Sequence, residues 1–346
     1  MEKIENIQEF HENNDAQARI PHPNKKIGIL FLVVVGLYIV MSVAMAAFSS
    51  LSPMGLQIVS TIAVTLLSVA VPSLVHILHG RQQGDRYNLG KLHKNQILPC
   101  ILFGIGFCFA MLAVMNIIQS AFMSAGVDLS KSPDNVAVET NTFVNFMLTV
   151  ICIAVAPAVC EELLCRSAVL YSFRSLGMYK AALWSGLFFA LLHVNLTSLP
   201  VYVALGFLFG VIAYKTRSVY STMIIHFVYN FTIIALQSIP TDNVEAAAEQ
   251  AFTISDPMMW IAVAVFAVIA CAFLVPAAIM FVRNCKKNDE AEAEACSMTV
   301  TEYLDNYNGI GEPRAPFGTA GVVVSMLILT ALMVSVGIYT INLCRA

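Results

Sequence analysis

The sequence predicts an all-α, polytopic membrane helix bundle of about nine transmembrane helices, with the N-terminus inside and the C-terminus outside. Of the 346 residues, 58% are hydrophobic and only 12% are charged, which is outside the balance of a soluble domain. Apolar runs of about 20 residues, the length needed to cross a bilayer, recur along the chain. The distribution of Lys and Arg around these runs then indicates the orientation.

Nine apolar runs are the candidate membrane helices, and the short sixth run has the weakest signal. The runs cover 27–50, 54–79, 97–122, 143–170, 181–197, 199–214, 219–238, 257–282 and 318–343.

Positive charge supports this number of spans. With the N-terminus inside, sixteen of the nineteen Lys and Arg fall in internal segments, only Lys131 and Arg345 fall outside, and Arg166 lies within the fourth run. Positive residues are retained on the cytoplasmic side of short loops, so an even number of spans would break the pattern. The net charge of −3 and the absence of a basic patch give no support to nucleic-acid binding.

We divide the chain into four parts. Residues 1–26 form a polar cytoplasmic tail without an apolar h-region, so we expect the first span to act as its own insertion signal. Residues 27–142 hold the first three helices, and 143–238 form a core that contains the polar groups described next. Residues 239–346 hold an external loop, two further helices and an acidic cytoplasmic loop at 284–317. The run DEAEAEA in that loop is interpreted as a solvated face or a short amphipathic helix in preference to a partner-binding element.

The fourth run contains every carboxylate found within the nine runs. These are Glu161 and Glu162, and the guanidinium of Arg166 lies four residues after Glu162, where an intrahelical ion pair can form. Glu161 is turned about 100° away from Glu162, so it is the carboxylate left available for chemistry. Pro157 is expected to kink the helix and to leave the carbonyl of Ile153 without its backbone donor.

Two histidines and one asparagine join this set. His193 lies in the fifth run and His226 in the seventh, with Asn230 four residues later on the same helical face. Ionisable groups at this depth are costly and usually face the protein interior. A glutamate, two histidines and an asparagine match the groups needed to activate water and to stabilise an oxyanion.

Three motifs in this order resemble a known family. Residues 161–166 read EELLCR and fit EExxxR, 189–193 read FALLH and fit FxxxH, and 226–230 read HFVYN and fit HxxxN. This trio on successive hydrophobic helices resembles the CAAX prenyl protease and bacteriocin-processing (CPBP, Abi) family of intramembrane endopeptidases. The resemblance covers about residues 143–238 and implies hydrolysis of a peptide bond in a polar cavity within the membrane.

The resemblance also implies roles for individual residues. Glu161, assisted by His193, would activate the water, while His226 and Asn230 would hold the oxyanion. We expect the cavity to open toward the cytoplasm.

Glu162 and Arg166 would orient the site. The family often has an aromatic residue before this arginine and a glycine after it, whereas Cys165 and Ser167 occupy those positions here. The departure concerns helix packing or substrate shape, because neither position supplies the chemistry.

The sequence leaves the metal open. His193 and His226 with Glu161 or Glu162 could form a His₂Glu zinc site with an open position for water. A metal-free site based on Glu161 is slightly favoured, and the sequence contains no HExxH motif that would decide between them.

Other functions are also considered at this stage. One is a catalytically silent immunity or scaffold protein of the membrane, and another is a proton-coupled transporter. For the endopeptidase we expect a multi-pass protein of the cell membrane. Its partners would be the lipid bilayer and a peptide or protein substrate, which is lipidated or a leader-peptide precursor.

Overall fold

The computed structural model describes residues 27–82, 86–129, 140–239, 253–308 and 319–345. Regular structure in these segments is helical, and the described residues contain no strand beyond one isolated antiparallel bridge between Leu89 and Ser218. The predicted all-α class is therefore confirmed. The predicted tail at 1–26 lies outside the described residues.

Eight helices in the described part of the chain are long and apolar enough to cross a membrane, as expected of an integral, multi-pass membrane protein. A further apolar helix, α9 (Met178–Leu192), has only 15 residues, about 22 Å of rise against a hydrocarbon core of about 30 Å. The sequence placed the weakest signal at 199–214, but α10 (Leu199–Thr216) is long enough, and the preceding helix is the short one. The eight candidate spans are Ile27–Phe48, Pro53–Arg81, Lys94–Ser124, Phe143–Leu176, Leu199–Thr216, Val219–Gln237, Pro257–Ala295 and Ala320–Cys344.

Three of the spans change helical type along their length. The first consists of α2 (Ile27–Ala44) and a 3₁₀ turn at Met45–Phe48, and the second of α3 (Pro53–Ser60), the π-helical η2 (Thr61–Ala70) and α4 (Val71–Arg81). The fourth consists of α6 (Phe143–Thr149), the π-helical η4 (Val150–Val155), α7 (Ala156–Glu162), the π-helical η5 (Leu163–Val169), α8 (Leu170–Phe173) and a 3₁₀ turn at Arg174–Leu176. The remaining helices are α5 (Lys94–Ser124), α11 (Val219–Gln237), α13 (Pro257–Ala295), α14 (Val300–Asn308) and α15 (Thr319–Cys344).

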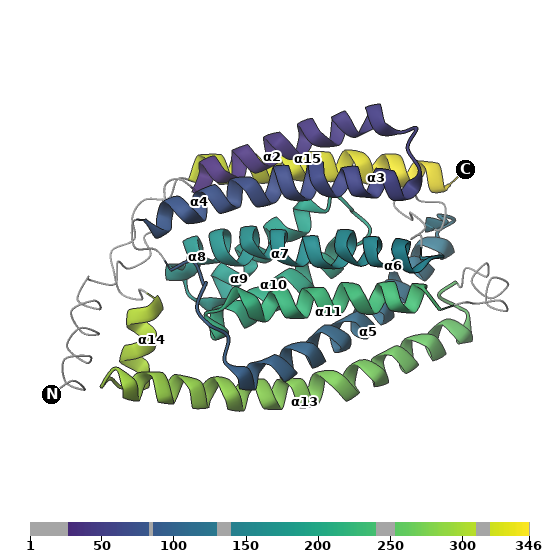
Figure 1. Ribbon diagram of the computed structural model, residues 1–346. Coiled ribbons are helices and arrows are strands. Elements are labelled where there is room, and N and C mark those ends of the chain that lie inside the picture. Colours follow the sequence, from purple (N-terminus) through teal and green to yellow (C-terminus); the bar gives the residue numbers. More distant parts are fainter. Residues whose placement is uncertain (1–26, 83–85, 130–139, 240–252, 309–318, 346) are drawn as a thin grey trace.

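The helices form three layers (Figure 1). One outer layer contains α2, α15, α3 and α4, and the opposite outer layer contains α5 and α13, which pack along each other. The middle layer contains α6–α8, α9, α10 and α11. The helices that carry the predicted site residues are therefore enclosed by apolar helices on both sides.

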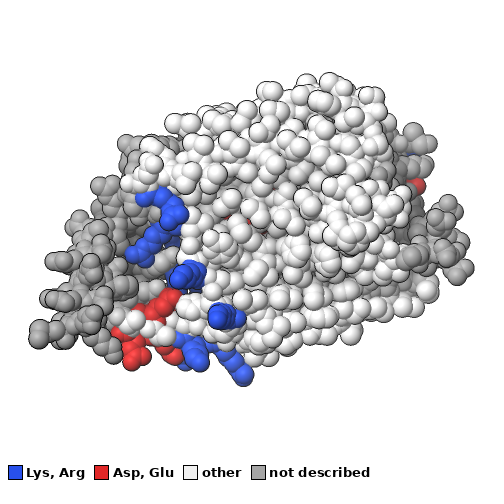
Figure 2. Space-filling view, viewed as in Figure 1, with Lys and Arg blue, Asp and Glu red and all other residues white. Residues whose placement is uncertain are grey.

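Charged side chains gather at one end of the molecule. On the face shown in Figure 2, most Lys, Arg, Asp and Glu lie near the end where α4 and α13 finish, and the wide area between the two ends shows only a small acidic patch near its centre. We call the end near α4 and α13 the charged end. A middle zone with so little charge is what a bilayer requires.

Small residues bring α9 and α10 into close contact. A Cβ built on Gly206 would lie 2.7 Å from Gly186 Cα, and one built on Gly210 would lie 2.8 Å from Ala182 Cα. Gly206 and Gly210 are four apart, the spacing by which small residues allow membrane helices to approach. This contact seats the short helix α9 against a full-length neighbour.

The first part of the predicted loop at 284–317 is helical. Residues 284–295 continue α13 to Ala295, because Ala, Glu and Lys are strong helix formers and no Gly or Pro interrupts them. The DEAEAEA run is thus the end of a long helix. Its acidic residues contact other parts of the chain, as described below.

Candidate active site

A buried ion pair lies at the centre of the fourth span. Arg166 Nη1 donates to Glu162 Oε1 at 3.1 Å, and both side chains are fully buried. Arg166 Nη2 also donates to the carbonyl of Gly206 at 3.2 Å, and its guanidinium lies over the rings of Phe189 and Phe209, at 4.7 and 5.3 Å from their centroids. The ion pair predicted from the spacing is present, and the Gly206 carbonyl and the two rings replace the water that the cation has lost.

His226 extends this pair onto a second helix. Its Nδ1 lies 3.0 Å from Glu162 Oε1, and its side chain is 7% exposed. A carboxylate accepts, so Nδ1 carries the proton and Nε2 is the ring atom left for another partner. Glu162 therefore orients the imidazole of His226 while Arg166 balances its charge.

Asn230 lies on the same face of α11 but contacts the helix that precedes the glutamates. Its Nδ2 donates to the carbonyl of Ile153 at 2.8 Å. In an α-helix that carbonyl would accept from residue 157, which is Pro157 and has no N–H. The side chain thus satisfies the group that the proline releases, and one N–H of its amide remains.

Glu161 and His193 form the more open half of the site. Glu161 Oε2 and His193 Nε2 are 4.0 Å apart, and the side chains are 20% and 25% exposed. Within the described part of the chain, Glu161 Oε2 has no hydrogen-bond partner. The two glutamates therefore differ as the 100° turn between them predicted, with Glu162 locked in an ion pair and Glu161 available.

The His193 ring faces Glu161 with an acceptor. Its Nδ1 lies 2.9 Å from the Phe189 carbonyl, which can only accept, so Nδ1 carries a proton. In the neutral form of the ring, Nε2 offers a lone pair toward the carboxylate of Glu161. Two acceptors 4.0 Å apart do not bond directly, but a water molecule that donates one hydrogen to each would satisfy both.

Aromatic rings and a strained turn hold His193. Its ring stacks on Tyr202, with centroids 4.0 Å apart, and lies 4.7 Å from the ring of Phe189. The next residue, Val194, has φ 48°, which is unusual for a β-branched residue. Tyr202 was missed by sequence reasoning because no spacing relates it to the FxxxH motif.

These side chains do not form a metal-ligand set. Among the described residues, no group of three or more His, Cys, Asp or Glu is arranged to hold a metal ion. Glu162 Oε1 is shared by Arg166 and His226. The side chains of the predicted His₂Glu zinc arrangement are therefore not assembled as a ligand group in the described residues.

A second buried arginine connects the site helix to the charged end. Arg174 is fully buried, donates through Nη1 to Asn88 Oδ1 and through Nη2 to the Tyr214 carbonyl at 3.1 Å, and lies over the Tyr214 ring. Asn88 in turn donates to the Arg166 carbonyl at 2.8 Å. From the sequence, Arg174 indicated only the topology of the chain. The structure shows that it is a buried structural group, although it lies at the end of a span.

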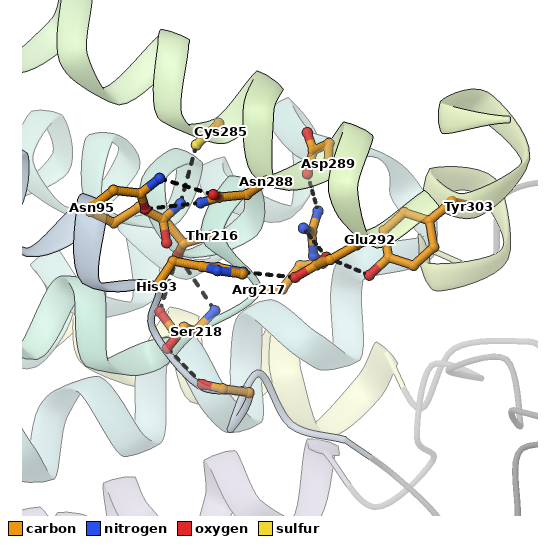
Figure 3. Close-up of polar contacts among 12 residues, drawn as sticks. His93, Asn95, Thr216, Arg217, Ser218, Cys285, Asn288, Asp289, Glu292 and Tyr303 are labelled. Atoms are coloured by element: carbon orange, nitrogen blue, oxygen red, sulfur yellow. Dashed lines mark hydrogen bonds and ion pairs between the residues drawn. The ribbon is translucent and has the colours of Figure 1, made fainter. Parts of the chain in front are cut away.

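A third cluster, the α13 clamp, holds the corner between α10 and α11 (Figure 3). Arg217 has left-handed backbone (φ 55°), its Nη1 is 2.8 Å from Asp289 Oδ1, and its Nη2 donates to Glu292 Oε2 at 2.6 Å. Glu292 also accepts from Tyr303 Oη at 2.7 Å and lies 2.8 Å from His93 Nε2. Burial, with the hydrogen bond to Glu292, raises the pKa of Tyr303. The acidic run was visible in the sequence, but its partner in the α10–α11 corner was not.

The class to which the site belongs is supported by comparison with known proteins. Residues 143–232 match the family described as "Type II CAAX prenyl endopeptidase Rce1-like". This segment carries the three motifs described above, so the predicted resemblance to CAAX-type intramembrane proteases is confirmed over these residues, about a quarter of the chain. No curated protein and no solved structure matches the chain.

Proposed function

We propose that this protein is an endopeptidase of the cell membrane that hydrolyses a peptide bond in a membrane-associated substrate with water held between Glu161 and His193. The observation that carries the proposal is the pair of facing acceptors, Glu161 Oε2 and His193 Nε2, 4.0 Å apart. A water molecule donating to both would be polarised toward hydroxide. Among the residues that the structure describes within the spans, the other nearby carboxylate is Glu162, which is neutralised by Arg166.

The proposed reaction begins with proton transfer from this water to Glu161. The resulting hydroxide attacks the carbonyl carbon of the scissile bond, and the carbonyl oxygen becomes an oxyanion. When the tetrahedral intermediate collapses, the C–N bond breaks and Glu161 returns the proton to the leaving amine. A positioned general acid and base of this kind typically contributes a factor of about 10²–10⁴.

The oxyanion would be held by α11. His226 Nε2 can donate when the ring is protonated, and the carboxylate of Glu162 at Nδ1 stabilises that imidazolium. The second N–H of the Asn230 amide is a further donor, because its first is used on Ile153. Donors fixed before the reaction stabilise developing charge without reorganisation. The proposed mechanism uses no metal.

We also propose that the chain crosses the membrane nine times, with the N-terminus inside and the charged end in the cytoplasm. The helices α9 and α10 run antiparallel, because Gly186 of α9 faces Gly206 of α10 and Ala182 faces Gly210. Counting α9 as a pass restores the alternation that the Lys and Arg distribution requires. From the start of α9 to His193 the helix rises about 22 Å, which supports a site deep in the bilayer.

The substrate class rests on the family and on this depth. A peptide bond must reach a site enclosed by membrane helices, so a substrate held at the membrane by a lipid or by an apolar leader segment is the suitable kind. Both the lipidated protein and the leader-peptide precursor satisfy this requirement. Access from the cytoplasmic side remains our prediction.

The test is terminal-peptide mass spectrometry of membranes from cells that produce the wild type, Glu161→Gln or His226→Ala at matched levels. We expect new peptide termini with the wild type only, and their persistence in the presence of a chelator. Glu290→Gln is the matched control, because Glu290 is an exposed glutamate at the charged end, and it should cleave like the wild type.

Two outcomes would contradict the proposal. Termini that persist with Glu161→Gln would remove this residue from the chemistry. If no termini differ between wild type and variants while all four proteins accumulate, the silent immunity or scaffold function would be favoured instead.

A further inference from the structure

An apolar groove runs along the outside of the bundle, between α5, α10 and α13. Its volume is about 730 Å³. The rings of Phe103, Phe107 and Phe281 line it, together with Leu208, Ile212 and Leu274. Because these helices are candidate membrane spans, the groove lies at the level of the lipid.

Polar side chains line only one end of this groove. They are Lys215 on α10 and Lys286, Asp289 and Glu290 on α13. From Leu274 to Asp289 the helix rises about 22 Å, more than the roughly 15 Å depth of one lipid leaflet's hydrocarbon. The groove therefore extends from the headgroup level at the charged end toward the middle of the bilayer, as a phospholipid does.

The lysines at this end are available to a ligand. Lys286 Nζ is 3.8 Å from Glu290 Oε1, with side chains 78% and 55% exposed, so this pair is weak and hydrated. Asp289 is already committed to Arg217 at 2.8 Å. Lys215 and Lys286 therefore offer two cationic side chains at this end of the groove for an anionic group.

We propose that the groove binds one membrane phospholipid, with an acyl chain along the three phenylalanines and its phosphate at Lys215 and Lys286. The groove is separate from the site of hydrolysis, because α10 lies between them. Phe209 of α10 shows this, since its ring lies 6.0 Å from the ring of Phe107 in the groove and 5.3 Å from the guanidinium of Arg166 on the other side. The occupant is thus a structural lipid that joins α13 to α10, and the lipid chain of a cleaved substrate belongs elsewhere.

The test uses the full-length protein in nanodiscs that contain a phosphatidylglycerol with a photoreactive group in its acyl chain. After irradiation, mass spectrometry identifies the labelled peptides. We expect labelling concentrated at 208–212 and 274–282. Loss of each lysine near an anionic lipid should weaken binding about fivefold. The Lys215→Ala and Lys286→Ala double variant should therefore need a higher probe concentration to reach the same labelling. Lys180→Ala is the control and should be labelled like the wild type.

A second pair of variants separates filling of the groove from loss of charge. Ala278→Trp fills the groove and should abolish labelling there, and Ala267→Trp, also exposed on α13, should leave it unchanged. Labelling spread evenly over all lipid-facing helices, or unaffected by the Lys and Trp changes, would overturn the proposal. Displacement of the probe by one equivalent of a farnesylated peptide would also overturn it and would assign the groove to a lipidated substrate.

Discussion

Removing Glu162 from the buried ion pair should destabilise the protein far more than removing a carboxylate from an exposed pair of the same spacing. Glu162→Leu leaves the fully buried guanidinium of Arg166 without a carboxylate partner. Breaking a buried pair in this way typically costs about 3–5 kcal/mol. Lys286 and Glu290 are the matched control, because they are also four apart on a helix but are 78% and 55% exposed, and Glu290→Leu should cost about 0.5 kcal/mol or less.

The second half of the prediction concerns the double variant Glu162→Leu and Arg166→Met. Replacing both members of a buried ion pair by apolar residues is often neutral or stabilising. Here it still leaves His226 Nδ1 without the acceptor that it has at 3.0 Å, a cost of about 1–3 kcal/mol. We therefore expect the double variant to be more stable than Glu162→Leu alone but less stable than the wild type.

The measurement is the free energy of unfolding in mixed micelles, titrated with a denaturing detergent and followed by far-ultraviolet circular dichroism. The reasoning fails if Glu162→Leu and Glu290→Leu differ by less than about 1 kcal/mol, because that would mean that the buried cation finds other compensation. It fails equally if the double variant is less stable than Glu162→Leu, since the charge of Arg166 would then be favourable without its partner.

Three further predictions concern other parts of the molecule. Gly206→Leu should separate α9 from α10 and lower the melting temperature, because its Cβ would lie 2.7 Å from Gly186 Cα. Gly36→Leu is the control and should leave the melting temperature unchanged, because a Cβ at Gly36 has nothing within 4 Å. Arg217→Ala should accelerate amide hydrogen exchange at the start of α11, because it removes two carboxylate contacts of the α13 clamp, and unchanged exchange would contradict the clamp. Hydrogen bonds from the backbone and side chain of Thr299 lower the pKa of Glu302. These hydrogen bonds therefore stabilise the start of α14 above the ordinary carboxyl pKa, and the stabilisation is lost as the pH falls through the lowered pKa of Glu302. NMR of the Glu302 carboxyl group should report a low pKa, and Thr299→Ala should raise it.

The sequence was sufficient for features that depend on spacing within one helix. Glu162 and Arg166 are four apart, so their pairing follows from helix geometry alone. The release of the Ile153 carbonyl follows in the same way from Pro157. These are local consequences of the chain's order, and the structure bears them out.

Contacts between helices could not be predicted in this way. The bonds of His226 to Glu162 and of Asn230 to Ile153 depend on how α11 packs against the fourth span, which the motif order does not specify. The length of α9 was missed because the turn after His193 contains apolar residues such as Leu196, so hydropathy continues past the helix end. Hydropathy records burial in lipid and does not record where the backbone turns.

Adjacent glutamates at one depth would normally oppose each other, because two carboxylates in a low-dielectric site repel strongly. Arg166 removes this conflict by pairing with Glu162 at 3.1 Å, so that Glu161 faces a neutral pair instead of a second anion. The same pairing gives His226 an acceptor for Nδ1, and the turn of about 100° between neighbouring residues directs Glu161 toward His193 on α9. One helix thereby presents a fixed, charge-balanced group to α11 and a free carboxylate to α9. The EExxxR spacing therefore makes two different carboxylate environments out of two consecutive residues.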